Sequence, residues 1–79
     1  MNTESIVSRG KRIYENQKGK LEQERKGQFV SIEPDSGELF FGSSFDEAVA
    51  SASESHPEKI SYTVRIGHEA AFHIGLMSK

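Results

Sequence analysis

Histidine and carboxylate side chains are the groups in this chain best suited to chemistry, and two of the three histidines lie close together. His68 and His73 are five residues apart, with Glu69 beside the first. Imidazole and carboxylate ligands can bind zinc, but this spacing matches none of the zinc motifs. We therefore expect ordinary surface histidines here and no bound metal.

A second group of acidic residues flanks a turn. Glu33, Asp35 and Glu38 are spaced so that they resemble part of a calcium-binding loop. The full spacing of such a loop, with its central Gly and its terminal Glu, is absent. We therefore interpret these carboxylates as residues that stabilise the turn.

Nucleophile and phosphate-binding motifs are also missing. Ser43 and Ser44 follow Gly42, but the Gly-x-Ser-x-Gly elbow of hydrolases is not formed, and a helix cap accounts for Ser44. No glycine-rich loop ends in Gly-Lys as a phosphate loop does. The sequence therefore predicts no catalytic residue and no cofactor, so we expect that the chain is not an enzyme.

Length and composition narrow the class of protein further. The chain has 79 residues, 34% of them hydrophobic, and no cysteine. This is enough for one small domain, and it excludes a disulfide framework and thiolate metal sites. No apolar run is long enough for a membrane span or a signal peptide, so we expect a cytoplasmic protein without a membrane partner.

Charge is distributed unevenly along the chain. Residues 1–27 carry seven Lys and Arg against four Glu, whereas residues 28–79 carry three basic and eight acidic groups. A basic segment joined to an acidic domain suggests a solvated helix with mixed charges, or a contact with an anionic partner such as nucleic acid. The basic residues of this segment are Arg9, Lys11, Arg12, Lys18, Lys20, Arg25 and Lys26.

Hydrophobic spacing predicts a helix followed by a hairpin. A narrow apolar stripe with helical spacing favours a helix over 4–17, continued by a frayed, charged run to Gly27. Residues 28–33 and 38–42 alternate as strands do, and Pro34-Asp35-Ser36-Gly37 between them is typical of a turn. We expect a basic helical segment over 1–26 and a small α+β domain over 27–79.

The second half of the chain predicts a short helix and two more strands. Ser44 with Glu47 forms a capping box for a helix that ends before Pro57. Residues 60–66 alternate strictly between apolar and polar side chains, and residues 70–74 form a shorter strand. The fold class is therefore α+β, an N-terminal helix followed by a ββαββ unit.

The expected architecture is a four-stranded antiparallel sheet with the second helix packed on one face. Phe29 and Phe40 fall on the opposite face, which the first helix or a partner would cover. The predicted core consists of Val30, Ile32, Leu39, Phe41, Phe45, Val49, Ile60, Tyr62, Val64, Ile66, Phe72 and Ile74.

Three stretches together resemble a family of short uncharacterised bacterial proteins: Lys-Gly-Gln-Phe-Val-Ser-Ile-Glu at 26–33, Ser-Gly-Glu at 36–38, and Arg-Ile-Gly-His-Glu-Ala-Ala-Phe at 65–72. The family has no assigned activity, and its genes often lie beside genes for retropepsin-like proteases, which implies a partner or an antitoxin-like regulator. Residues 41–48 are also locally similar to the strand-to-helix step of HicB-type antitoxins. This chain lacks the helix-turn-helix or ribbon-helix-helix that binds DNA.

Two functional hypotheses follow. The first is a non-enzymatic protein-binding module, a monomer or a homodimer, whose protein partner is unknown. The alternative is a nucleic-acid-binding protein that uses the basic N-terminal helix. Aromatic and Arg side chains dominate protein interfaces, so the residues expected to contact a partner are Ile6, Arg9, Arg12, Ile13, Tyr14, Phe29, Phe40 and Arg65. The apolar residues among these could instead close the second face of the protein's own core.

Overall fold

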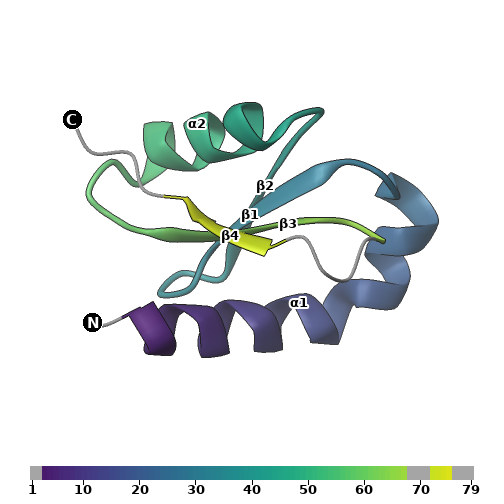
Figure 1. Cartoon of the computed structure of the whole chain (residues 1–79), viewed down its shortest axis with the longest axis horizontal. Helices are drawn as coiled ribbons and strands as arrows, with labels where there is room; N and C mark the ends of the chain where they lie inside the picture. Colours follow the sequence, from purple (N-terminus) through teal and green to yellow (C-terminus); the bar gives the residue numbers. More distant parts are fainter. Residues whose placement is uncertain (1–2, 68–71, 76–79) are drawn as a thin grey trace.

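The elements follow one another as helix, two strands, helix and two strands. The structure is a computed structural model that describes residues 3–67 and 72–75, with side chains for 5–67. The helices are α1 (Thr3–Arg25) and α2 (Phe45–Ser55), and the strands are β1 (Phe29–Glu33), β2 (Glu38–Gly42), β3 (Ser61–Arg65) and β4 (Phe72–Gly75). As Figure 1 shows, α1 and α2 lie on opposite sides of the sheet.

The predicted hairpin is confirmed. β1 and β2 pair antiparallel, and the last pair before the turn is Glu33 with Glu38. Gly37 closes the turn at φ +78°, a conformation that glycine adopts without steric cost. Its N–H donates to the carbonyl of Glu33 at 2.7 Å, so the turn fixes the register of the two strands.

The capping box of the second helix is also confirmed. The hydroxyl of Ser44 accepts from the N–H of Glu47 at 3.2 Å. The Glu47 carboxylate accepts from the N–H of Ser43 at 2.9 Å and from its hydroxyl at 2.8 Å. These bonds lower the pKa of Glu47, because they stabilise the ionised form. The helix ends at Ser55, before His56 and Pro57.

The first helix is longer than predicted. It is continuous from Thr3 to Arg25, whereas the sequence predicted a helix over 4–17 and a frayed run beyond it. Leu21 is only 4% exposed, and this apolar anchor holds the last turns on the sheet. The helix ends where Gly27 takes φ +93°, a conformation that favours glycine at a helix C-terminus.

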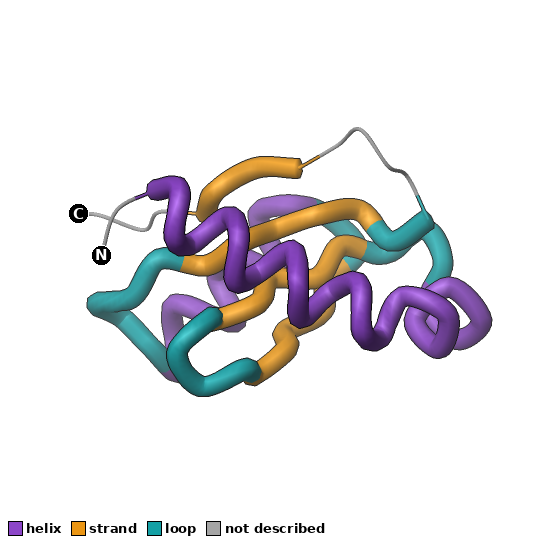
Figure 2. The backbone as a smooth tube through the Cα atoms, turned by 90° about the horizontal axis from the view of Figure 1, so that it is seen from below, coloured by secondary structure: helices purple, strands orange, loops and turns teal. Residues whose placement is uncertain are grey.

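α1 covers the apolar face of the sheet, and it crosses the strands obliquely in Figure 2. Large aliphatic and aromatic side chains from the helix and the strands meet in a single core. The buried members of this core are Ile6, Tyr14, Leu21, Val30, Ile32, Tyr62, Val64 and Ile66. Burial of this apolar area is the main stabilising contribution to the fold.

α2 covers the other face, whose buried centre is formed by small polar residues. Ser31 and Thr63 are both fully buried, and their hydroxyls lie 2.7 Å apart in a hydrogen bond. The helix places Ala48, Val49 and Ala52 against this side. Small side chains on both surfaces allow the helix and the sheet to approach closely, and the hydrogen bond satisfies the hydroxyls that this burial removes from water.

The predicted architecture is therefore wrong in two respects. Among residues 5–67, whose side chains the structure describes, the layered core is built on three antiparallel strands, β2, β1 and β3, rather than on the four expected. β4 adds only a four-residue backbone pairing along the outer edge of β3. The helix on the apolar face is α1 rather than the second helix, because the small inner residues of α2 fit the Ser and Thr face instead.

Some predictions lie outside the described residues. These are the turn at His68 and Glu69, the start of the last strand at Ala70, and the core side chains Phe72 and Ile74. The segment 1–26 contributes Ile6, Tyr14 and Leu21 to the common core, so within the described chain it packs as part of the same body as the sheet. Neither described helix combines the length and the apolarity that crossing a membrane requires.

Candidate interaction surface

The structure buries the N-terminal apolar residues that were expected to contact a partner. Ile6 is 2% exposed and Tyr14 is 9% exposed, and Ile13 is half-buried against the same core. The hydroxyl of Tyr14 also accepts from the N–H of Gly67, 3.3 Å away. These side chains close the protein's own core rather than a partner surface, but on the face of Val30 and Ile32 and not on the Phe29 and Phe40 face that the sequence left open.

Phe29, Phe40 and Arg65 lie on the α2 side of the sheet and keep part of their surface exposed. The Arg65 guanidinium lies 5.7 Å from the centroid of the Phe29 ring, and its Nε donates to the carbonyl of Gly27 at 3.1 Å. The Phe40 ring packs edge-on against the His56 ring, with centroids 5.9 Å apart. His56 in turn pairs with Glu38, so His56 contacts two residues of β2 near the start of the strand.

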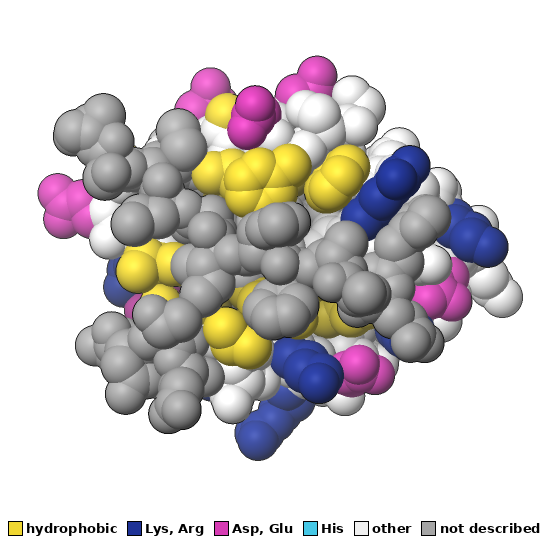
Figure 3. Space-filling view, viewed as in Figure 1, with side chains coloured by type: hydrophobic (Ala, Val, Ile, Leu, Met, Phe, Trp, Pro, Cys, Tyr) yellow, Lys and Arg dark blue, Asp and Glu magenta, His cyan; other side chains and the backbone are white. Residues whose placement is uncertain are grey.

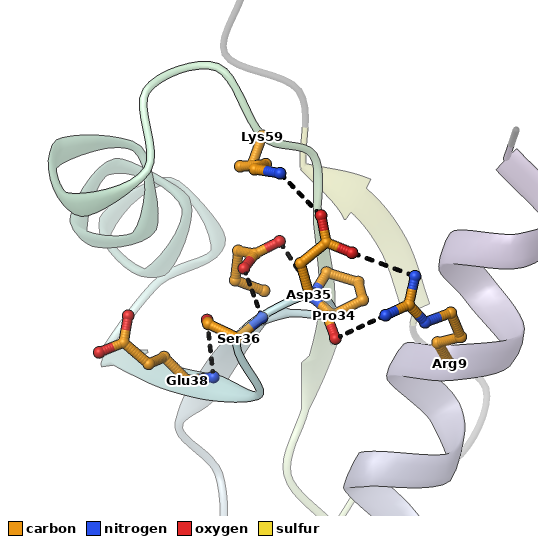
Figure 4. Close-up of polar contacts among 7 residues, drawn as sticks. Arg9, Pro34, Asp35, Ser36, Glu38 and Lys59 are labelled. Carbon is orange, nitrogen blue, oxygen red and sulfur yellow. Dashed lines mark hydrogen bonds and ion pairs between the residues drawn. The ribbon is translucent and has the colours of Figure 1, made fainter. Parts of the chain in front are cut away.

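Arg9 is engaged within the protein, as Figure 4 shows. It donates to the carbonyl of Pro34 at 3.3 Å and pairs with the carboxylate of Asp35 at 3.1 Å. Lys59 approaches the other carboxylate oxygen at 2.7 Å. Arg9, Asp35 and Lys59 therefore tie α1, the β1–β2 turn and the segment before β3 together. Arg12 is exposed on α1.

The same turn contains two carboxylates with shifted pKa values. The hydrogen bond from Lys59 and the attraction of Lys59 and Arg9 hold the pKa of Asp35 below its ordinary value. Burial of Glu33 opposes ionisation, but the backbone N–H groups of Asp35 and Ser36 donate to its carboxylate and its pKa is lowered. The Glu33 carboxylate therefore stabilises the turn, as the sequence predicted, whereas the Asp35 carboxylate joins the turn to Arg9 and Lys59.

The outer edge of β2 is the surface that sequence reasoning did not identify. β2 is the end strand of the sheet and pairs only with β1 among the described residues. The N–H of Ile66 donates to the carbonyl of Gln28, so the backbone N–H and C=O groups of alternate β1 residues, starting at Gln28, point to β3. The backbone groups of the intervening residues, Phe29, Ser31 and Glu33, point to β2. The backbone groups of their register partners on β2, Gly42, Phe40 and Glu38, therefore point toward β1.

It follows that the backbone N–H and C=O groups of Leu39 and Phe41 point outward, away from β1. The side chains of Leu39, Phe40 and Phe41 are all half-buried, so an apolar margin borders this row of polar groups. Leu39 and Phe41 share the α1 side with Val30 and Ile32, whereas Phe40 lies on the α2 side with Ser31. The alternation in the sequence could have shown two faces but not which strand ends the sheet.

A group of cations lies at the end of the sheet where α1 leads into β1. Arg25 stacks on the Phe41 ring at 4.2 Å, Lys26 is exposed, and Arg65 stacks on Phe29. Lys and Arg side chains are visible at this end in Figure 3. The ion pairs found within residues 5–67 leave these three cations without a carboxylate partner.

A cavity of about 320 Å³ lies between α1 and β3. Lys11 and Lys18 line it together with Glu15 and Glu22, so the charges of the lining offset one another. Burial raises the pKa of Tyr62 at its wall, and the nearby Glu15 and Tyr14 raise it further. Neutral tyrosine and balanced charges give this cavity no preference for an ion of either sign.

The absence of a metal site expected from the sequence stays a prediction. Among residues 5–67, whose side chains are described, no three His, Asp or Glu side chains are grouped so that they could hold a metal ion. His68, Glu69 and the side chain of His73 lie outside the described part. Ser43 and Ser44 serve the cap of α2.

Comparison with protein-family models, with curated proteins and with solved structures finds no match. The resemblance of 26–33, 36–38 and 65–72 to a bacterial family therefore stays a prediction. The functional argument rests on the geometry of the β2 edge and the cations beside it.

Proposed function

We propose that this chain is a non-enzymatic protein-binding module that accepts an extended segment of a partner protein along the outer edge of β2. The observation that carries the proposal is the outward row of backbone groups at Leu39 and Phe41 between half-exposed apolar side chains. Such an edge binds a strand through main-chain hydrogen bonds and selects it through side-chain contacts.

The sequence of β2 supports this reading of the edge. Natural sheets protect their end strands with charges, proline, bulges or a covering element. β2 reads Glu-Leu-Phe-Phe-Gly, its pairing with β1 runs through all five residues without interruption, and its only charge is at Glu38. An edge strand that is apolar and regular can pair with a strand of another chain.

The resemblance to a bacterial family suggests a candidate partner. In the family that 26–33 and 65–72 resemble, the adjacent genes often encode retropepsin-like proteases, so an antitoxin-like or regulatory role toward such a product is the finer form of the proposal. The partner would add a strand to β2 rather than insert a side chain into the core.

Substitution of Leu39 by proline tests the proposal. Leu39→Pro removes one outward N–H and leaves the bonds to β1 in place. A stoichiometric partner that co-purifies with the unaltered chain should be lost by Leu39→Pro and kept by Lys11→Ala, which alters the α1 cavity instead. Equal recovery with Leu39→Pro would contradict binding at this edge, as would a compact monomer that recovers no partner from the source cells.

Nucleic-acid binding is the second candidate, and the cations Arg25, Lys26 and Arg65 favour it because two of them stack on aromatic rings. Single-stranded nucleic acids bind where positive charge and aromatic faces combine. Titration with single- and double-stranded oligonucleotides at increasing salt tests this candidate, since counterion release makes such binding strongest at low salt. No binding at low salt removes it.

A further inference from the structure

Arg25 is held over the edge strand by two contacts. Its guanidinium carbon lies 4.2 Å from the centroid of the Phe41 ring, and its Nη1 donates to the Oε1 of Gln28 at 3.3 Å. A guanidinium has five N–H donors, and no ion pair within residues 5–67 uses those of Arg25. The stacked ring orients this planar group before any ligand arrives, which reduces the entropy lost on binding.

A strand added to β2 would place one of its residues directly beside this guanidinium. Antiparallel pairing is the more stable arrangement, and the Cβ atoms of opposite residues lie about 4.5–5.5 Å apart. The residue opposite Phe41 points to the α1 side of the sheet, the side on which Arg25 stacks. A carboxylate at that position can accept two parallel bonds from the guanidinium.

Other positions along the edge disfavour a carboxylate. The residue opposite Gly42 points to the α2 side, where a Cβ on Gly42 would lie 2.7 Å from the Cβ of Glu47. The residue opposite Glu38 faces that carboxylate, which His56 already binds. Among the described side chains beside β2, Glu38 and Glu47 therefore place negative charge at these two positions and Arg25 places positive charge beside Phe41.

A second copy of the chain does not satisfy this pattern. Antiparallel pairing of β2 with itself about Phe40 places Leu39 opposite Phe41, so Arg25 gains no carboxylate. The same pairing brings Glu38 of one copy opposite Gly42 of the other, next to Glu47. Like charges at this distance oppose the pairing.

We infer, on the basis of the proposed function, that the partner segment runs antiparallel to β2 and carries Asp or Glu opposite Phe41, where Arg25 binds its carboxylate. Apolar residues lie opposite Phe40 and Leu39, and a basic or neutral residue lies opposite Glu38. The bound segment thus begins acidic and ends basic, because antiparallel pairing brings its first residues to Arg25 and its last residues to Glu38 at the start of β2.

Two synthetic peptides of equal composition test the inference. The probe is acetyl-Thr-Asp-Val-Val-Lys-Thr-amide, whose Asp falls opposite Phe41 and whose Lys falls opposite Glu38. The control is acetyl-Thr-Lys-Val-Val-Asp-Thr-amide, in which the two charges are exchanged. Each is titrated into the ¹⁵N-labelled full chain to millimolar concentration, and the amide shifts of Leu39 and Phe41 give both the site and the dissociation constant.

The probe should bind at least about fivefold more tightly than the control, because the exchange removes exposed ion pairs at both Arg25 and Glu38. Arg25→Gln should reduce this preference to the part that Glu38 contributes, whereas Lys20→Gln, which changes another exposed cation of α1, should keep it in full. Equal affinity of both peptides with shifts at β2 would overturn the carboxylate assignment and leave strand addition intact. Absence of β2 shifts with either peptide would overturn strand addition itself.

Two further outcomes assign the edge to a different occupant. Shifts of the Leu39 and Phe41 amides that depend on protein concentration without peptide would show a second copy at the edge and overturn the inference. Saturable binding of an oligonucleotide that is lost in Arg25→Gln, without shifts at β2, would assign Arg25 to nucleic acid and overturn it as well.

Discussion

Gly10 of α1 lies directly against Tyr62 of β3, with no room for a side chain between them. A Cβ built on Gly10 would lie 2.6 Å from the Cγ of Tyr62, closer than carbon atoms approach without displacement. The glycine therefore allows the helix backbone to pack on the aromatic ring. A Cβ built on Gly19, on the same helix, would have no neighbouring atom within 4 Å, so the two glycines have opposite structural roles.

Alanine at these two glycines should have opposite effects on stability. Gly10→Ala should lower the free energy of unfolding by about 1–3 kcal/mol, because overpacking against Tyr62 outweighs the better helix propensity. Gly19→Ala should raise it by up to about 1 kcal/mol through helix propensity alone. Urea unfolding of both variants measures the difference, and stabilisation by Gly10→Ala would contradict the close contact.

The buried hydroxyl pair between Ser31 and Thr63 should show strong energetic coupling. Ser31→Ala or Thr63→Val alone leaves one buried hydroxyl without its partner, at a cost of about 1–3 kcal/mol. The double variant leaves neither hydroxyl and should be less destabilised than the sum of the two single variants. A double-mutant cycle by urea unfolding measures the coupling, and strictly additive losses would show that the hydrogen bond does not hold this face together.

Features of the fold that depend on neighbouring residues could be predicted from the sequence, whereas features that depend on contacts between distant elements could not. The turn at 34–37 and the cap at Ser44 are set by neighbouring residues, and both were predicted correctly. The side of the sheet that each helix covers depends on how well side-chain sizes match across the layers. The small Ala48 and Ala52 of α2 fit the polar face, and the larger Leu21 of α1 fits the apolar face. Local periodicity carries no information on that match.

The candidate site was harder still to predict. The outward direction of the Leu39 and Phe41 backbone follows from the order of the strands, and Arg25 meets Phe41 only because α1 continues past its expected end at 17. Phe40 was predicted as a contact residue and does border the β2 edge. Ile6 and Tyr14 have the same residue types as interface anchors, but burial against the sheet assigns them to the core.

The ion pairs of Asp35 should make stability depend on pH in the acid range. Because the pKa of Asp35 is lowered in the folded protein, its contribution is complete above the ordinary Asp pKa of about 3.9 and is lost as the pH falls through the lower folded value. Asp35→Asn should therefore lower the melting temperature at pH 6, and the difference from the unaltered chain should vanish at the acid end. Melting curves between pH 2 and pH 7 measure it.

Salt and a neutral control separate this effect from general acid unfolding. Since Asp35, Arg9 and Lys59 are partly exposed, added NaCl should reduce the effect of Asp35→Asn at pH 6. Glu58→Gln removes an exposed carboxylate that has no ion pair within residues 5–67, and it should leave the melting temperature nearly unchanged. A difference for Asp35→Asn that persists unchanged at low pH would contradict the ion-pair origin.

Proline should be tolerated at Leu39 and not at Phe40, because their backbone N–H groups point in opposite directions. The N–H of Phe40 faces β1, where its register partner is Ser31, so a proline removes a ladder bond and leaves a carbonyl without its donor. Relative to alanine at the same position, Phe40→Pro should cost about 1–3 kcal/mol more, and Leu39→Pro should differ by less than about 1 kcal/mol. Urea unfolding of the proline and alanine variants at both positions gives these differences. The comparison with alanine removes the effect of losing the side chain. The reverse order would mean that Phe40, rather than Leu39 and Phe41, offers its backbone to a partner, and the strand proposed to bind at this edge would then need a register shifted by one residue.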